Sequence, residues 1–237
     1  MPWFHAVAER YHDIQNPISA EKIRLLGERI SLAPGQRVLD IASGRGGPAM
    51  VLASSFGCEV VGVEKANVFA QAARERIAAG GLEDLISIHE QDAADFRIEP
   101  EGWDAAMCLG ASWIWGGLEG TVAALVPGVR RGGYVAVGEV YRRRPAPGAD
   151  DQFVSLAETV RGFERAGPPV TTVIAASQED WDAYESQHWA SLEEWLAENA
   201  GDPGAAEIRA EYERWKWHYL ESGRETDGWV ILAGRKR

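Results

Sequence analysis

Three acidic residues, Asp40, Glu64 and Asp92, each stand at or just after the end of an apolar stretch of the sequence. Glu64 comes 20 residues after Gly44, a spacing at which a carboxylate can accept hydrogen bonds from both hydroxyls of a ribose. Asp92 and the adjacent Ala93 could meet the exocyclic amine of an adenine. Each carboxylate alone could be an ordinary solvated group. Three of them after successive apolar stretches predict a binding site for a nucleoside.

The stretch between the first two carboxylates has the composition of a ligand-binding turn. Within residues 37–41, Val38, Leu39 and Ile41 suit a buried parallel strand. Gly44, Gly46 and Gly47 follow, and glycine lets the backbone turn sharply and approach a ligand closely. Pro48 suits the first turn of a helix, because its missing N–H needs no partner there. Such a turn presents unpaired N–H groups to a polar or anionic ligand, although some glycine-rich turns are purely structural.

The elements that must position these residues alternate along the chain. The predicted strands are residues 37–41, 59–63, 85–88, 103–109, 133–138, 170–175 and 229–233. Helices are predicted between the strands, at residues 48–57, around Phe69, Ala73 and Ile77, and at residues 118–125. This alternation favours an α/β fold with a doubly wound sheet, in which ligands bind at the carboxyl ends of the strands. We expect residues 1–237 to form a single domain.

Further helical segments flank and interrupt this alternating part. Residues 1–34 are predicted to hold two short helices, the first over residues 5–12 and the second beginning at Ser19. Another helix is expected at about residues 151–165. Residues 177–224 are rich in aromatic side chains at helical spacing and precede the last strand. They are predicted to form a helical cap.

The charge of the chain bears on its partners. The formal net charge is −12 and the pI is near 4.9, which disfavours binding to a phosphate backbone, so no nucleic-acid partner is expected. The dense basic run at residues 142–144 is expected to be a solvated loop after a strand. No membrane segment and no secretion signal are recognisable, so a cytoplasmic location is predicted. Cys58 and Cys108 stand in strand-like runs, and no metal site is expected.

Several of these motifs together resemble the class I S-adenosylmethionine-dependent methyltransferases. The broad resemblance rests on residues 38–46, on Glu64 after its apolar run, and on residues 91–93. Shorter motifs are similar to the bacterial YjhP-like methyltransferases, and these motifs are residues 12–17, 110–117, 137–139 and 182–185. The resemblance covers nearly the whole chain. It implies a seven-stranded sheet of order 3-2-1-4-5-7-6 with an antiparallel last strand.

The resemblance also implies where S-adenosylmethionine binds. The methionine part would lie against the glycine turn and Leu109, Glu64 would bind the ribose with Lys65 beside it, and Asp92 with Ala93 would contact the adenine. The residues assigned to the cofactor in this way are Ala42, Ser43, Gly44, Gly46, Glu64, Lys65, Asp92, Ala93 and Leu109. Ala42 departs from the family pattern, in which a glycine usually stands at this position. Its methyl group should be tolerated.

Two other functions are compatible with the glycine turn. A nicotinamide- or flavin-dependent oxidoreductase would use the same Gly44-x-Gly46-x-x-Ala49 pattern, with Glu64 on its ribose. Against the oxidoreductase, S-adenosylmethionine has no pyrophosphate to occupy the helix N-terminus, and the additional Asp40, Asp92 and terminal strand favour the methyltransferase. The second alternative is a non-catalytic cofactor-binding module that acts through partners, for which the aromatic residues 177–224 would supply the surface.

Methyl transfer from a sulfonium needs alignment and exclusion of water, and needs a base only if the attacking O, N or C atom must lose a proton. Candidates for that base are Glu139, at the end of the fifth strand, and His12, which could fold over the mouth of the cofactor site. Trp113 and Trp115 lie in the loop after the fourth strand and could stack on a cationic acceptor.

His188 and Trp189, in the predicted cap, could line the acceptor pocket. Packing within the cap is the more common role for such residues. Because the chain has no basic face and no added recognition domain, a small-molecule acceptor is predicted. The oligomeric state does not follow from the sequence.

Overall fold

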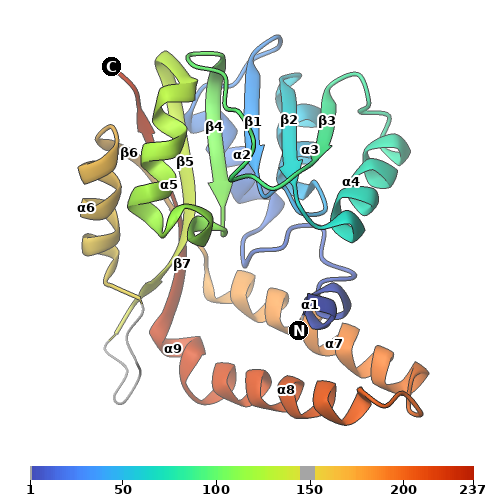
Figure 1. Cartoon of the computed structure of the whole chain (residues 1–237). Coiled ribbons are helices and arrows are strands. Elements are labelled where there is room, and N and C mark those ends of the chain that lie inside the picture. Colours follow the sequence, from blue (N-terminus) through green and yellow to red (C-terminus); the bar gives the residue numbers. More distant parts are fainter. Residues whose placement is uncertain (1, 145–152) are drawn as a thin grey trace.

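The fold is built on one mixed β-sheet. The computed structural model describes residues 2–144 and 153–237. Within them, seven strands form a sheet of order β3-β2-β1-β4-β5-β7-β6, in which β7 is antiparallel to both of its neighbours (Figure 1). The strands are β1 (Arg37–Ile41), β2 (Glu59–Glu64), β3 (Ile86–Glu90), β4 (Trp103–Leu109), β5 (Val129–Arg142), β6 (Val170–Ala175) and β7 (Asp227–Arg235). The predicted fold class and strand order are confirmed.

Helices cover both faces of the sheet. They are α1 (Pro2–Ala8), α2 (Ala20–Arg29), α3 (Gly47–Phe56), α4 (Asn67–Ala79), α5 (Leu118–Leu125), α6 (Leu156–Ala166), α7 (Gln178–Glu198), α8 (Ala205–His218) and α9 (Arg224–Thr226). Side chains of α2, α3 and α4 pack on one face, and those of α5 and α6 on the other. Val38 belongs to the first core and Leu39 to the second, because successive side chains of a strand point to opposite faces.

The two strands β5 and β7 are longer than predicted. They pair from Tyr134 and Arg235 at one end to Arg142 and Asp227 at the other. The additional length carries polar residues that pair across the ladder, and the side chain of Arg142 donates to Asp227. The expectation that residues 142–144 form a solvated loop is therefore wrong for Arg142, which belongs to β5. Arg143 follows the strand as expected, but its half-buried side chain donates to Gln178.

The helical insertion lies between β6 and β7. Ser177 begins α7 with a reciprocal cap, in which its hydroxyl accepts from the N–H of Asp180 while the Asp180 carboxylate accepts from the N–H of Ser177. Figure 1 shows α1, α7 and α8 beyond the carboxyl ends of the central strands. Phe4 of α1 packs among Leu192 and Ile208 of this layer. The cap is thus closed by the N-terminal helix as well as by the insertion.

Two helix boundaries differ from the sequence prediction. The first helix ends at Ala8 instead of His12, and residues 9–11 form turns. The side chain of His12 then bonds to the carbonyl oxygen of Tyr184. The helix expected at about residues 151–165 begins at Leu156, after Ser155 as its N-cap. Residues 151 and 152 lie outside the described part of the chain.

Candidate active site

Glu64 joins the end of β2 to the glycine turn after β1. Its Oε2 accepts from the N–H of Gly44 at 2.9 Å, and its Oε1 accepts from the N–H of Ala66 at 2.7 Å. The two strands are parallel neighbours, so their carboxyl ends meet at one edge of the sheet. The carboxylate is buried but lies against a cavity. It therefore fixes the turn and still has lone pairs for a ligand.

The N-terminal segment lies across this turn. Gln15 accepts from the N–H of Arg45 at 2.8 Å, and Asn16 donates to the carbonyl oxygen of Leu109 at 2.9 Å. A Cβ added at Gly44 would come within 2.1 Å of the Gln15 amide oxygen, and Gly44 has a φ of +54°. Glycine is therefore favoured here by the backbone conformation, and a larger residue would also have to displace the Gln15 side chain from its bond to Arg45.

Asp40 lies at the end of β1, on the wall of the same cavity. Its side chain is 1% exposed, and its Oδ2 has no hydrogen-bond partner. Burial, together with the nearby charge of Glu64, raises the pKa of Asp40 to about 8. An unpartnered buried carboxyl group at the mouth of a turn suits a ligand that carries a positive charge.

The raised pKa makes stability depend on pH. The folded protein binds the Asp40 proton more tightly than the unfolded chain, where the pKa is near its ordinary 3.8. Stability is therefore lost as the pH rises from about 4 to about 8. We expect Asp40→Asn to remove this loss. The free energy of unfolding of the variant, relative to that of the wild type, should therefore rise with pH by up to about 1.4 kcal/mol per pH unit. Urea unfolding of both proteins at pH 5, 6, 7 and 8 measures the difference, and a constant difference would contradict the prediction.

Ala42 adopts a left-handed conformation, with a φ of +55°. This conformation is strained for a residue with a Cβ. We expect Ala42→Gly to raise the free energy of unfolding by about 0.5–1 kcal/mol, measured by urea unfolding. Ala78→Gly, on the exposed face of α4, is the control and should lower it by about 1 kcal/mol. A loss of stability in both variants would show that the Ala42 methyl group stabilises the turn by more than the strain.

A single cavity of about 1420 Å³ connects the glycine turn with the cap. Its walls on the sheet side include Asp40, Gly44 and Glu64, and its walls on the cap side include Tyr184 and His188. Ligand pockets commonly measure about 300–1,000 Å³, so this cavity is larger than one small ligand needs.

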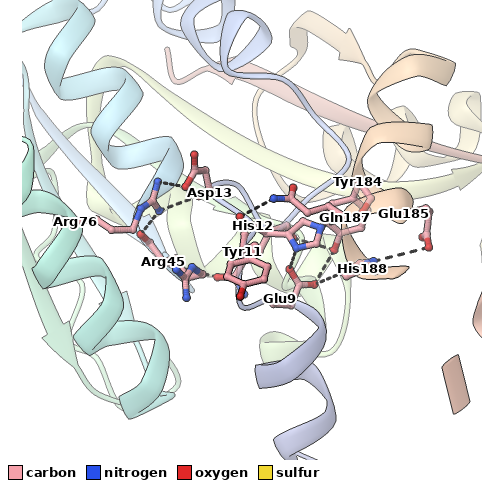
Figure 2. A network of polar contacts seen from close by, with 11 residues as sticks. Glu9, Tyr11, His12, Asp13, Arg45, Arg76, Tyr184, Glu185, Gln187 and His188 are labelled. Atoms are coloured by element: carbon pink, nitrogen blue, oxygen red, sulfur yellow. Dashed lines mark hydrogen bonds and ion pairs between the residues drawn. The ribbon is translucent and has the colours of Figure 1, made fainter. Parts of the chain in front are cut away.

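A cluster of buried polar groups forms the wall of this cavity on the cap side (Figure 2). Glu9 accepts from His188 at 2.9 Å and from the Tyr184 hydroxyl at 3.0 Å, and His12 lies beside it. Burial alone would lower the pKa of His188, but the carboxylates of Glu9 and Glu185, which face the two nitrogens of its ring, outweigh it and raise the pKa to about 9. For His12, burial dominates and lowers the pKa.

Comparisons with known proteins agree with this geometry. The family described as a methyltransferase domain matches residues 38–133. The protein YjhP of Escherichia coli K12, which is described as uncharacterized, is 32% identical over 98% of both chains. A methyltransferase of Geobacter sulfurreducens, solved with S-adenosylhomocysteine, is 32% identical with a TM-score of 0.94, and the match covers 100% of this chain and 99% of that one. One from Thiobacillus denitrificans, also solved with S-adenosylhomocysteine, is 31% identical with a TM-score of 0.93, over the same shares of the two chains.

The chain belongs to the YjhP-like methyltransferases. It is an S-adenosylmethionine-dependent enzyme of class I. Nothing in the comparisons supports the oxidoreductase or the non-catalytic module that the glycine turn also allowed. None of the helices in the described part of the chain is long and apolar enough to cross a membrane.

The site of this YjhP-like methyltransferase fits its cofactor chemically. S-adenosylmethionine carries an ammonium group and two ribose hydroxyls, and the turn offers the unpartnered Asp40 and the free lone pairs of Glu64. Of the residues assigned to the cofactor, Ala42, Ser43, Gly44, Glu64 and Leu109 line the cavity.

The other residues assigned to the cofactor do not line the cavity. Gly46 faces α4, where an added Cβ would come within 3.3 Å of the Ala73 methyl carbon. Lys65 is exposed and paired with Asp92 at 2.6 Å, and Asp92 also accepts from the N–H of Ala94. Ala93 is buried in the core. The assignment of these four residues to the cofactor therefore stays a prediction.

Only some of the residues predicted for catalysis and for the acceptor line the cavity. Trp113, Glu139 and His188 line the cavity, with Trp113 73% exposed at its edge. Trp115 packs against the core on the α5 face, and Trp189 contacts Lys216 and Tyr219 within the cap. Neither of these two tryptophans lines the cavity.

His12 is 1% exposed and does not line the cavity. It bonds to the carbonyl oxygen of Tyr184 instead of covering the cofactor mouth. We therefore do not retain it as a base for the acceptor. Gln15 and Asn16 do line the cavity but were missed as site residues. The motif at residues 12–17 was noticed only as a family resemblance, and it was the available signal.

Proposed function

We propose that this methyltransferase acts on a small-molecule acceptor that binds between the glycine turn and the cap. The observation that supports it most is the continuous cavity of about 1420 Å³ that lies between the sheet on one side and the N-terminal helix and the insertion on the other. A cavity of this size has room for the cofactor and for a second small ligand. The roof of helices leaves less access to a folded macromolecule.

On the sheet side, the proposal places the cofactor against the glycine turn. Glu64 would accept from the ribose hydroxyls, because it already points into the cavity while it holds the turn. Asp40 would pair with the ammonium group, which would give its unpartnered oxygen a donor. Ser43 and Leu109 would flank the methionine part. Asp92 and Ala93 would contact the adenine.

On the cap side, the acceptor would meet aromatic and acidic groups. Trp113 and Trp215 offer ring faces, and Glu139 and Glu185 offer carboxylates. The chain would align the acceptor and keep water out, and such alignment lowers the barrier to transfer. The bound cofactor supplies a methyl group on a positively charged sulfur, which the acceptor atom takes by in-line displacement. The absence of a nucleic-acid partner and the cytoplasmic location remain predictions.

Glu139 is the proposed base for an acceptor atom that carries a proton. It is half-buried at the cavity wall, and burial raises its pKa above the usual range although Ser112 and the N–H of Val140 bond to it. We expect Glu139→Gln to lower kcat for such an acceptor by about 10²–10⁴-fold, with the affinity for S-adenosylhomocysteine unchanged. Initial rates across pH measure this. Full turnover by the variant would remove Glu139 from the role.

The proposed function is tested by following the methyl group. The full-length protein is incubated with methyl-labelled S-adenosylmethionine and an extract separated into small molecules, protein and RNA. We expect enzyme-dependent label in the small-molecule fraction, and a Glu64→Ala variant serves as the inactive control. Label confined to protein or to RNA would contradict the small-molecule proposal.

A further inference from the structure

We propose that Glu9, His12 and His188 bind a divalent transition-metal ion, with Zn²⁺ as the best-suited probe. The site would lie on the cavity wall, between the segment after α1 and the middle of α7. Figure 2 shows the three side chains converging there, together with Tyr184 and Glu185. This inference is independent of the acceptor, because it concerns the metal content of the protein.

The three side chains bring metal-binding atoms close together away from water. One ligand atom from each of them lies within 4.8 Å of the others. Glu9 is 8% exposed, His12 is 1% exposed and His188 is 3% exposed. Glu9 Oε2, His12 Nδ1 and His188 Nδ1 are buried and have no hydrogen-bond partner. A buried polar atom without a partner is costly. A metal ion would bind Glu9 Oε2 and His12 Nδ1 directly, and His188 would bind it through Nε2 and leave Nδ1 facing the Glu185 carboxylate.

The orientation of the His12 ring shows where a cation would bind. Its Nε2 lies 3.0 Å from the carbonyl oxygen of Tyr184, which can only accept, so Nε2 carries a hydrogen. Its Nδ1 then faces Glu9 Oε2 at 3.6 Å. In the neutral ring, two acceptors with lone pairs therefore point at each other. A metal ion between them would bind both.

Two of the proposed ligands, His12 and Glu9, have the bonded outer partner that metal ligands usually have, and the third, His188, has a carboxylate nearby. His12 donates its other N–H to a backbone carbonyl oxygen, and Glu9 accepts from the Tyr184 hydroxyl at 3.0 Å. His188 has Nε2 on the Glu9 side at 2.9 Å and Nδ1 toward Glu185 Oε2 at 3.8 Å. A carboxylate behind a ligating histidine is a recurring arrangement that fixes the ring and strengthens the nitrogen donor.

The donor set indicates which ions fit. Two imidazole nitrogens and one carboxylate oxygen bind Zn²⁺ in sites that keep one position open, whereas Mg²⁺ and Ca²⁺ prefer oxygen donors. Glu9 and His188 line the cavity, so the open position would face it. The ion would join the N-terminal segment to α7, two parts of the chain about 180 residues apart. No local motif in the sequence brings these residues together, so no metal site was expected.

The test is direct measurement of metal. Full-length protein is stripped with a chelator, dialysed, and titrated with Zn²⁺ by calorimetry and by elemental analysis after removal of free metal. We expect one Zn²⁺ per chain and a higher unfolding temperature with Zn²⁺. When Co²⁺ replaces Zn²⁺, we expect the visible absorption bands that are typical of a Co²⁺ ion with few ligands. If the protein retains neither Zn²⁺ nor Co²⁺ in stoichiometric amount, the proposal is overturned. The cluster would then be a buried ion pair of Glu9 with protonated His188.

Variants decide whether the bound metal sits at these residues. His12→Asn and His188→Asn should each lose more than about 100-fold in Zn²⁺ affinity, and Glu185→Gln about 10–100-fold. His89→Asn is the matched control, because His89 is an exposed histidine of β3 away from the cluster, and it should bind as the wild type does. Equal binding by all of these proteins would place the metal elsewhere and contradict the proposal. If the two histidine variants fail to fold, Glu185→Gln and Tyr184→Phe decide it by the same affinity comparison.

Discussion

Glu64→Ala is expected to weaken binding of S-adenosylhomocysteine by at least about 100-fold. Hydrogen bonds to a charged group each contribute roughly 1.5–3 kcal/mol, and about 1.4 kcal/mol corresponds to tenfold in affinity. In our proposal the variant loses the bonds to two ribose hydroxyls. It also leaves the N–H groups of Gly44 and Ala66 without their acceptor, so the turn itself loosens. Calorimetric titration measures the loss, with circular dichroism as the check that the variant is folded.

The matched control for this variant is Glu90→Ala. Glu90 lies opposite Glu64 in the ladder between β2 and β3, so it has the same residue type at the same level of the sheet. It is exposed and bonds to Asn67 and Arg74 instead of to the glycine turn. We expect its affinity to equal that of the wild type. Equal losses in the two variants would show that charge at this edge matters and that the particular position of Glu64 does not.

Gly47→Ala is expected to displace the N-terminal segment from the glycine turn. An added Cβ would come within 1.9 Å of the backbone oxygen of Asp13, which cannot swing away as a side chain could. Residues 13–16 would have to move, and the bonds from Gln15 to the turn and from Asn16 to Leu109 would break. Overpacking of this kind lowers the free energy of unfolding by about 1–3 kcal/mol.

Urea unfolding measures this loss, and affinity for S-adenosylhomocysteine should fall by roughly tenfold, equivalent to about 1.4 kcal/mol. Gly201→Ala is the control, because an added Cβ there meets nothing within 4 Å and the residue has no positive φ. It should change neither quantity. If Gly47→Ala has the same free energy of unfolding as the wild type, residues 13–16 do not pack against the start of α3.

The parts of the site that follow from local sequence were predictable. An apolar run, three glycines and a proline place a strand, a turn and a helix in order, and Glu64 follows because β2 comes next in the chain and lies beside β1. The strand order and the antiparallel β7 came from the family resemblance and are confirmed by the structure. Periodicity alone would not have supplied them.

Contacts between distant segments were not predictable. Nothing near Gln15 in the sequence shows that its amide reaches the N–H of Arg45. Trp189 and His188 are adjacent in α7, yet one turns into the cap and the other toward the cavity. Helical spacing gives the faces of a helix, but which face meets which neighbour depends on how α1, α7 and α8 pack. The basic run that holds Arg142 indicates a loop, and nothing in the local sequence reveals its partner, Asp227, which stands 85 residues later.

A crystal structure of the protein with S-adenosylhomocysteine tests the central claim most directly. We predict that the ribose hydroxyls lie within hydrogen-bond distance of the Glu64 carboxylate and that the ammonium group lies beside Asp40. The sulfur should face the part of the cavity that is bounded by Glu139 and His188, with space left for an acceptor. Binding with the ribose away from Glu64, or with the cofactor filling the space under α7 and α8, would contradict the account.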